Sequence, residues 1–134
     1  MIGTCLYCKT EFDYNPSQKR GKYCNNYCQQ MYQHQLKVEN WLTGKEVPGL
    51  KTIKRYLKEQ SNCCSKCGIF KWNNIPITLE IDHIDGNPYN NNLNNLSLLC
   101  PNCHSQTPTY KSKNRGNGRV ERRERAKKDY YRTL

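Results

Sequence analysis

Cysteine spacing constrains this chain more than any other feature of its sequence. Six of its nine cysteines form three CxxC pairs, and Cys24 and Cys28 add a CxxxC pair. A CxxC turn presents two thiolates to a single metal ion. The apolar fraction is only 35%, and the mean hydropathy is -1.03. Because such a composition builds a poor core, we expect bound metal to supply part of the folding energy.

The pairs predict two structural Zn²⁺ sites with closed tetrahedral sulfur coordination. The predicted ligands of the first are Cys5, Cys8, Cys24 and Cys28, and those of the second are Cys64, Cys67, Cys100 and Cys103. Gly68 permits a tight turn after the second CxxC pair. Cys63 is an alternative to Cys64, because it forms a CxxxC pair with Cys67.

Charge and the absence of long apolar runs limit the classes of partner that the chain can have. The first 20 residues hold no apolar run of signal-peptide length, and the chain has no run of the ~20 apolar residues that span a bilayer. We therefore expect a reducing, cytoplasmic setting and no membrane partner. Residues 111–134 hold ten Lys or Arg against three acids, and the formal net charge is +11. Two four-thiolate zinc sites would remove four of these charges. The remaining surplus predicts a nucleic acid partner.

Periodicity predicts a simple order of elements. Helices are expected from about Asn25 to Leu42 and over residues 51–60, strands of one hairpin over 75–84 and 95–100, and a helix start at Pro101. The predicted domains are a zinc module (1–44), a second zinc-containing domain (45–112) and a basic extension (113–134). His34 lies on the first helix and is expected to pack or face solvent, because four cysteines already supply that zinc site.

A second kind of metal site is predicted around two histidines. Neighbouring helical residues diverge by ~100°, so His104 cannot face the ion that Cys103 binds. Asp82 and an imidazole make a plausible open site for Mg²⁺ or Mn²⁺. His83 also continues an apolar alternation, so a core histidine is an alternative. On an ideal strand Asp82 would face the opposite side from His83, so a bend or bulge would be needed to turn Asp82 toward the site. Six asparagines follow within residues 87–95, where amides can close turns without adding negative charge.

The stretch "LEIDHIDGNPYNNNLNNLSLLCPNCH", with "CSKCG" upstream, resembles the HNH endonucleases of the ββα-metal (His-Me finger) superfamily, and most closely small phage-type members. The resemblance covers about residues 52–112. It implies an α+β fold, namely a small zinc-stabilised ββα-metal domain, here with an N-terminal four-cysteine module, helices and a basic C-terminal helix or tail. It also implies that His83 is the general base and that Asp82 and His104 bind a catalytic Mg²⁺ or Mn²⁺. Asn95 would brace the loop and orient the base, with Asn94 as the alternative.

The predicted function is metal-dependent cleavage of double-stranded DNA, by nicking or double-strand breakage, in the cytoplasm of a phage-infected bacterium. A homing-type or packaging-associated role and a monomer are expected. One alternative is a zinc-stabilised DNA-binding regulator with a non-catalytic HNH fold, and another is a colicin-type nuclease toxin, which the absence of a receptor-binding segment disfavours. DNA contacts are expected from Lys19, Arg20 and Lys22 and from Arg115, Arg119, Arg122, Arg123 and Arg125, although a solvated tail is an alternative.

Overall fold

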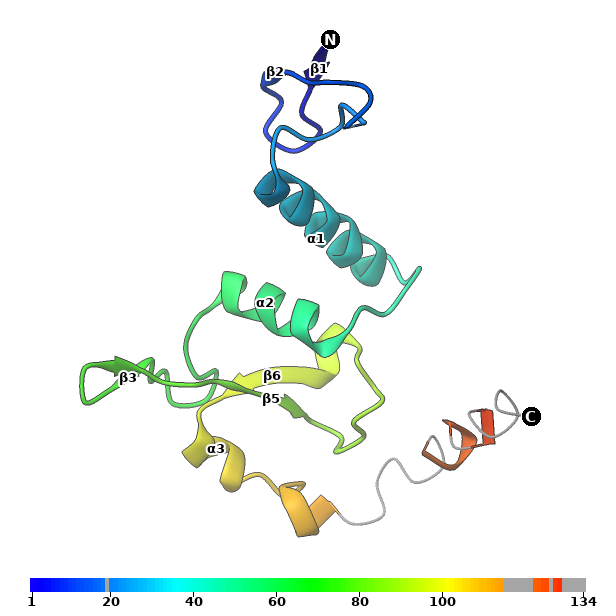
Figure 1. The fold of residues 1–134 in the computed structure, drawn as a ribbon. Coiled ribbons are helices and arrows are strands. Elements are labelled where there is room, and N and C mark those ends of the chain that lie inside the picture. Colours follow the sequence, from blue (N-terminus) through cyan, green and yellow to red (C-terminus); the bar gives the residue numbers. More distant parts are fainter. Residues whose placement is uncertain (19, 115–121, 126, 129–134) are drawn as a thin grey trace. The chain divides into compact units, whose positions relative to one another are not determined.

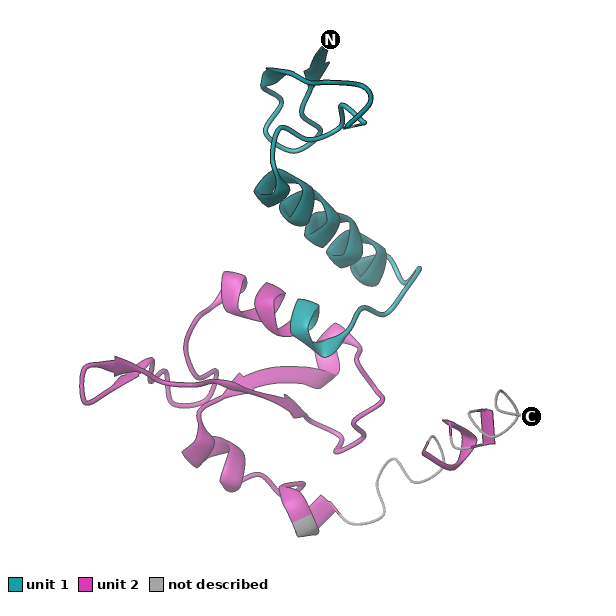
Figure 2. Ribbon diagram, in the orientation of Figure 1, with its two compact units in different colours: residues 1–53 teal, residues 54–134 magenta. Residues whose placement is uncertain are grey.

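The computed structural model describes residues 1–18, 20–114, 122–125 and 127–128. It contains two compact units, Met1–Ile53 and Lys54–Leu134 (Figure 2). The division falls inside helix α2 (Leu50–Gln60), whereas the predicted boundary at residue 45 precedes that helix. The proposed DNA contacts of Lys19, Arg115 and Arg119 lie outside the described residues.

Unit 1 consists of a short hairpin and one long helix. Strands β1 (Ile2–Thr4) and β2 (Glu11–Asp13) pair antiparallel, and helix α1 spans Asn26–Leu42 (Figure 1). The helix begins at Asn25, whose side-chain Oδ1 accepts a hydrogen bond from the backbone N–H of Cys28 at 2.8 Å. Such a cap satisfies a donor that the first helical turn leaves without a partner. The helix predicted from about Asn25 to Leu42 is confirmed.

Unit 2 contains a short ribbon that the sequence analysis missed. Strands β3 (Lys71–Trp72) and β4 (Ile75–Pro76) pair antiparallel around Asn73 and Asn74. These two asparagines have φ of 51° and 61°, the left-handed values that a two-residue type I′ turn requires. The single strand predicted over residues 75–84 is therefore wrong, because the chain pairs first with β3 and only later with β6.

A second hairpin and a short helix complete unit 2. Strand β5 (Glu80–His83) pairs antiparallel with β6 (Leu96–Leu99), from Glu80 opposite Leu99 to His83 opposite Leu96. A 3₁₀ turn (Leu93–Asn95) precedes β6, helix α3 (Pro101–Ser105) follows it, and a second 3₁₀ turn covers Lys111–Asn114 (Figure 1). The predicted hairpin partners and the helix start at Pro101 are confirmed.

The core of unit 2 is small and rich in sulfur. Its buried members are Cys64, Leu79, Leu98, Leu99, Cys100 and Cys103. Leu57 of α2 and three isoleucines, Ile69, Ile77 and Ile81, pack against this cluster. Mixed helix and strand around a cysteine-rich centre confirms the predicted α+β class. Half of the buried core residues are thiols, so a metal ion bound by them would couple its binding to the folding of this unit.

No helix among the described residues is both long enough and apolar enough to cross a membrane.

Candidate metal centres and active site

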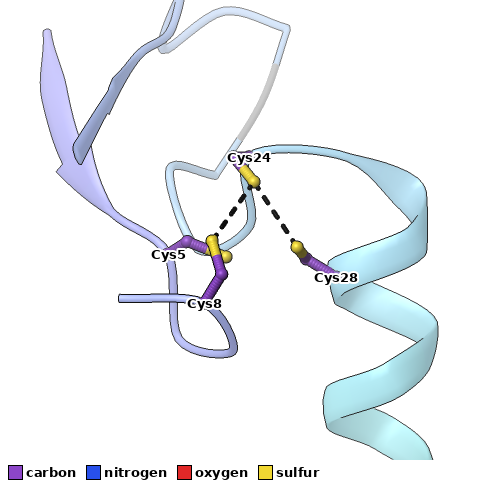
Figure 3. A group of neighbouring side chains, drawn as sticks. All are labelled: Cys5, Cys8, Cys24 and Cys28. Carbon is purple, nitrogen blue, oxygen red and sulfur yellow. Dashed lines mark hydrogen bonds between the residues drawn. The ribbon is translucent and has the colours of Figure 1, made fainter. Parts of the chain in front are cut away.

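The first cysteine cluster joins the hairpin of unit 1 to the start of α1. The sulfur atoms of Cys5, Cys8, Cys24 and Cys28 all lie within 4.8 Å of one another and point toward a common centre (Figure 3). Cys8 Sγ is 3.7 Å from Cys24 Sγ, which is 3.5 Å from Cys28 Sγ. This arrangement can hold one tetrahedral Zn²⁺. His34 is buried on α1 and is not a member of the cluster.

The second cluster lies in the core of unit 2. It contains Cys64, Cys67, Cys100 and Cys103, whose sulfur atoms also lie within 4.8 Å of one another. Cys67 Sγ and Cys100 Sγ are 3.8 Å apart. The structure thus groups Cys64, rather than Cys63, with the other three. Cys63 Sγ instead lies 3.2 Å from the hydroxyl of Ser61.

The two CxxC turns share one backbone geometry. The N–H of Lys9 donates to Cys5 O at 3.0 Å, and the N–H of Gly68 donates to Cys64 O at 2.9 Å. Both donor residues have positive φ, 64° for Lys9 and 77° for Gly68. The first turn therefore places a lysine where the second has a glycine, in a conformation that costs a side-chain-bearing residue roughly 1–2 kcal/mol.

The pKa values within each cluster diverge. Burial raises the pKa of Cys64, but backbone N–H groups of Cys67, Cys100 and Lys66 outweigh it and lower the pKa to about 6. Burial raises the pKa of Cys103 to about 12. Several thiolates so close together repel one another, so full ionisation of either set requires a cation.

Three polar side chains converge beside the second cluster. Glu80 and Asp82 are two residues apart on β5 and so share one face of the strand. His104 of α3 meets both: its Nδ1 is 2.5 Å from Glu80 Oε2, and its Nε2 is 3.6 Å from Asp82 Oδ1. The β5–β6 register is continuous through Asp82. The predicted bend or bulge is therefore wrong, because α3 brings His104 to the face that Asp82 already occupies.

The hydrogen bond to Glu80 fixes the tautomer of a neutral His104 ring. An ionised carboxylate only accepts, so Nδ1 carries the hydrogen and Nε2 presents a lone pair. That lone pair faces the carboxylate of Asp82, which is 8% exposed. Two electron-pair donors 3.6 Å apart suit a shared cation, and a carboxylate behind a ligating imidazole is the usual support for such a ligand. The neighbouring ring of Tyr110 packs edge-on against His104 at 5.3 Å between centroids.

His83 meets a different partner. Its Nε2 lies 2.7 Å from Oδ1 of Asn91, and the ring is partly exposed. An amide oxygen accepts, so Nε2 carries the hydrogen and Nδ1 of a neutral ring is left as the basic atom. The structure therefore makes Asn91 the direct neighbour of this imidazole, a contact that the sequence analysis did not assign.

The asparagine loop is organised around Asp85. Its carboxylate accepts hydrogen bonds from Asn90 Nδ2 at 2.8 Å, from the Asn87 N–H at 2.8 Å and from Asn95 Nδ2 at 2.9 Å. The bond from Asn90, followed by that from Asn87, lowers the pKa of Asp85 below its ordinary value. The amides thus stabilise an ionised carboxylate in the loop, as well as closing its turns.

Asn95 and Asn94 occupy different environments. Asn95 is 8% exposed, and its side chain also accepts from the Asp85 N–H at 3.0 Å and donates to Asn90 O at 2.8 Å. Asn94 is exposed. The described contacts place Asn95 as a brace between β6 and the loop that carries Asn91.

Glu80, Asp85 and Asn91 are the polar residues around this site that sequence reasoning missed. A signal existed for Glu80, because strand alternation places it on the same face as Asp82. Which of six asparagines reaches His83 depends on the loop path, and local sequence does not specify that path.

A polar cleft lies on unit 1. Its volume is about 690 Å³, and its lining includes Arg20, Lys22, Asn25, Asn26, Gln29 and Gln33. None of the described residues that line it is acidic, and the amides of Gln29 and Gln33 lie one helical turn apart on α1. Basic and amide side chains together suit contacts to phosphates and to base edges.

Comparison with known proteins adds one relative. The chain is 43% identical over 81 residues to the H-N-H endonuclease F-TflIV of Escherichia phage T5. The shared stretch covers 59% of this chain and 36% of the relative, so the chain matches about a third of that protein's length. No family model and no solved structure matches the chain. The comparison confirms the predicted resemblance to phage HNH endonucleases.

Proposed function

We propose that this chain is a metal-dependent DNA endonuclease of the HNH type that hydrolyses phosphodiester bonds through His83. The observation that carries the proposal is the pairing of His104 Nε2 with Asp82 Oδ1 across 3.6 Å, beside a second imidazole held by an amide. Similarity to a phage H-N-H endonuclease supports the reaction class.

Asp82 and His104 are the proposed ligands of a catalytic divalent ion, Mg²⁺ or Mn²⁺. One carboxylate and one imidazole suit these ions and leave coordination positions for phosphate and water. When bound, the ion would supply Lewis-acid stabilisation of charge on the phosphate and the departing oxygen. Glu80 supports this pair by holding Nδ1–H of His104, which keeps Nε2 available as a ligand. The two four-cysteine clusters are proposed to hold structural Zn²⁺.

His83 is the proposed general base. With Nε2–H donated to Asn91, Nδ1 of the neutral ring can accept a proton from the attacking water. Asn95 acts on His83 indirectly, because it ties the loop that carries Asn91 to the start of β6. We regard Asn95 as a positioning residue.

Double-stranded DNA is the proposed substrate, and the cleft of unit 1 the proposed recognition surface. Arg20 and Lys22 supply phosphate contacts, whereas Gln29 and Gln33 supply groups of the kind that read adenine in the major groove. Arg122, Arg123 and Arg125 are exposed and add basic charge. Because the relative belongs to a phage, we place the activity in the cytoplasm of an infected bacterium, in a homing or packaging role.

Incubation of supercoiled plasmid with zinc-loaded protein and Mg²⁺ or Mn²⁺ tests the proposal. We expect nicked or linear product from the unsubstituted chain, and His83→Ala to slow the cleavage rate by roughly 10² to 10⁴, the usual contribution of a general base. Asn94→Ala is the matched control, because Asn94 is exposed in the same loop, and it should cleave normally. DNA binding without cleavage by the unsubstituted protein would instead identify a DNA-binding regulator.

A further inference from the structure

The β3–β4 ribbon exposes three large apolar side chains. Phe70 is 58% exposed, Trp72 is 66% exposed and Ile75 is 67% exposed. Trp72 lies directly opposite Ile75, and Phe70 precedes Trp72 by two residues. The N–H of Ile77 donates to Phe70 O at 2.9 Å, so the pairing extends to Phe70. Because side chains alternate along a strand, all three lie on one face of the ribbon.

The ribbon gathers three exposed large apolar side chains on one short segment of the chain. The core of unit 2 is small, yet two of the chain's four Phe and Trp residues are exposed to solvent, Trp72 on β3 and Phe70 directly before it. The ribbon extends away from the β5–β6 hairpin (Figure 1). Single exposed apolar residues need no explanation, whereas a contiguous exposed apolar face marks an interaction surface.

The basic charge around the ribbon favours a negatively charged partner. No Asp or Glu occurs from Cys64 to Leu79, and Lys66 and Lys71 are both exposed. Lys71 Nζ lies 6.0 Å from the centroid of the Phe70 ring. A second copy of a chain with a formal charge of +11 would be repelled here, whereas a polyanion would be attracted. DNA offers both the phosphates and the apolar base faces that such a surface fits.

Connectivity limits how far the ribbon can lie from the candidate active site. Ile75 and Asp82 are separated by seven residue steps, which span at most roughly 25 Å. Successive base pairs are ~3.4 Å apart along duplex DNA. The distance from Ile75 to the proposed metal ligand Asp82 therefore corresponds to at most about seven base steps.

We propose that Phe70, Trp72 and Ile75 of the β3–β4 ribbon contact a base step of double-stranded DNA, within about seven base steps of the phosphate that is cleaved. This inference rests on the proposed function for the presence of DNA at the site. Apolar wedges of this kind partly unstack the bases that they contact and bend the duplex.

Tryptophan fluorescence tests the proposal, because the chain has only two tryptophans and Trp41 is buried. The full-length, zinc-loaded His83→Ala protein, which should not cut, is titrated with a fluorescein-labelled mixed-sequence duplex of about 30 base pairs. Anisotropy of the label reports binding, and protein emission reports Trp72. A Trp41→Phe version, checked for its fold by circular dichroism, isolates the Trp72 signal.

We expect emission from Trp72 to be quenched as anisotropy rises, and Trp72→Ala or Phe70→Ala to weaken binding by roughly 5- to 100-fold, the usual range for a base-stacking side chain. Val47→Ala is the matched control, because Val47 is 65% exposed outside the ribbon, and its affinity should not change.

The possible failures are distinguishable. Full binding with unchanged Trp72 emission, or with unchanged affinity in both ribbon variants, overturns the ribbon proposal and leaves the proposed function standing. The absence of any anisotropy change overturns the proposed function and, with it, this inference. Quenching that depends on protein concentration without DNA would show that a second copy covers the ribbon, which also overturns the proposal.

Discussion

At the scale of single residues, the sequence order Asp-His, Asn and Cys-x-x-Cys-His led to most of the candidate site. Asp82, His83, Asn95 and His104 could all be named because their residue types limit what each can do: carboxylate and imidazole bind metal, and a second imidazole can accept a proton. The partners of these residues could not be named. The path of one loop brings Asn91 to His83 and also brings the hydrogen-bond donors to the carboxylate of Asp85.

Asp85 provides a prediction at this scale. Because its native pKa lies below the ordinary value, ionised Asp85 stabilises the loop above its unfolded pKa of ~3.9, and this contribution is lost as pH falls through the native pKa. Asn90→Ala removes the largest cause of the shift and should raise the Asp85 pKa toward ~3.9. Carboxyl-carbon NMR titration measures this change.

Asn94→Ala serves as the control for that titration, because Asn94 is an exposed amide of the same loop. An Asp85 pKa that stays equally low after Asn90→Ala would contradict the assignment of the shift to that hydrogen bond.

At the scale of elements, periodicity predicted α1, α2, β6 and the start of α3, because their apolar spacing or capping residues are local signals. It failed between residues 71 and 79. The dipeptide Asn73-Asn74 was the available signal for a two-residue turn, but β3 and β4 have only two residues each, too few for an alternation to be visible. The shared geometry of the two CxxC turns was also invisible, because Lys9 does not signal a positive φ as Gly68 does.

The two turns make a matched pair for measurement. Gly68→Ala should lower the free energy of unfolding of zinc-loaded unit 2 by about 1–2 kcal/mol, because Gly68 has φ of 77°. An added Cβ at Gly68 would meet no atom within 4 Å, so the loss measures conformation alone. Lys9→Gly should relieve the corresponding strain in unit 1. Denaturant unfolding measures both, and an unchanged stability in Gly68→Ala would contradict the argument.

At the scale of the whole molecule, the chain consists of two compact units, each with its own cysteine cluster. Unit 2 combines two centres on one short helix: Cys100 caps α3, Cys103 lies in its first turn, and His104 follows immediately. Structural metal at the cluster would therefore fix the direction of the adjacent imidazole. Length and cysteine count predicted two zinc modules, but the division inside α2 could not be predicted, because no break in the periodicity of that helix marks it.

This organisation predicts that Cys64→Ser affects one unit only. The zinc content of the full chain should fall from two ions to one, and amide NMR signals of unit 2 should lose their dispersion while those of unit 1 persist, because structural zinc binding supplies folding energy. His83→Ala is the control and should retain both ions. Loss of the folded signals of unit 1, or retention of two zinc ions, would contradict independent zinc-dependent folding.

The most direct test of the proposed catalytic centre is anomalous diffraction from crystals of the zinc-loaded chain soaked in Mn²⁺. The proposal predicts a manganese peak within coordination distance of Asp82 Oδ1 and His104 Nε2, which lie 3.6 Å apart here, with Glu80 still holding His104 Nδ1. No manganese at this position, with a doubly protonated His104 paired to both carboxylates instead, would contradict it.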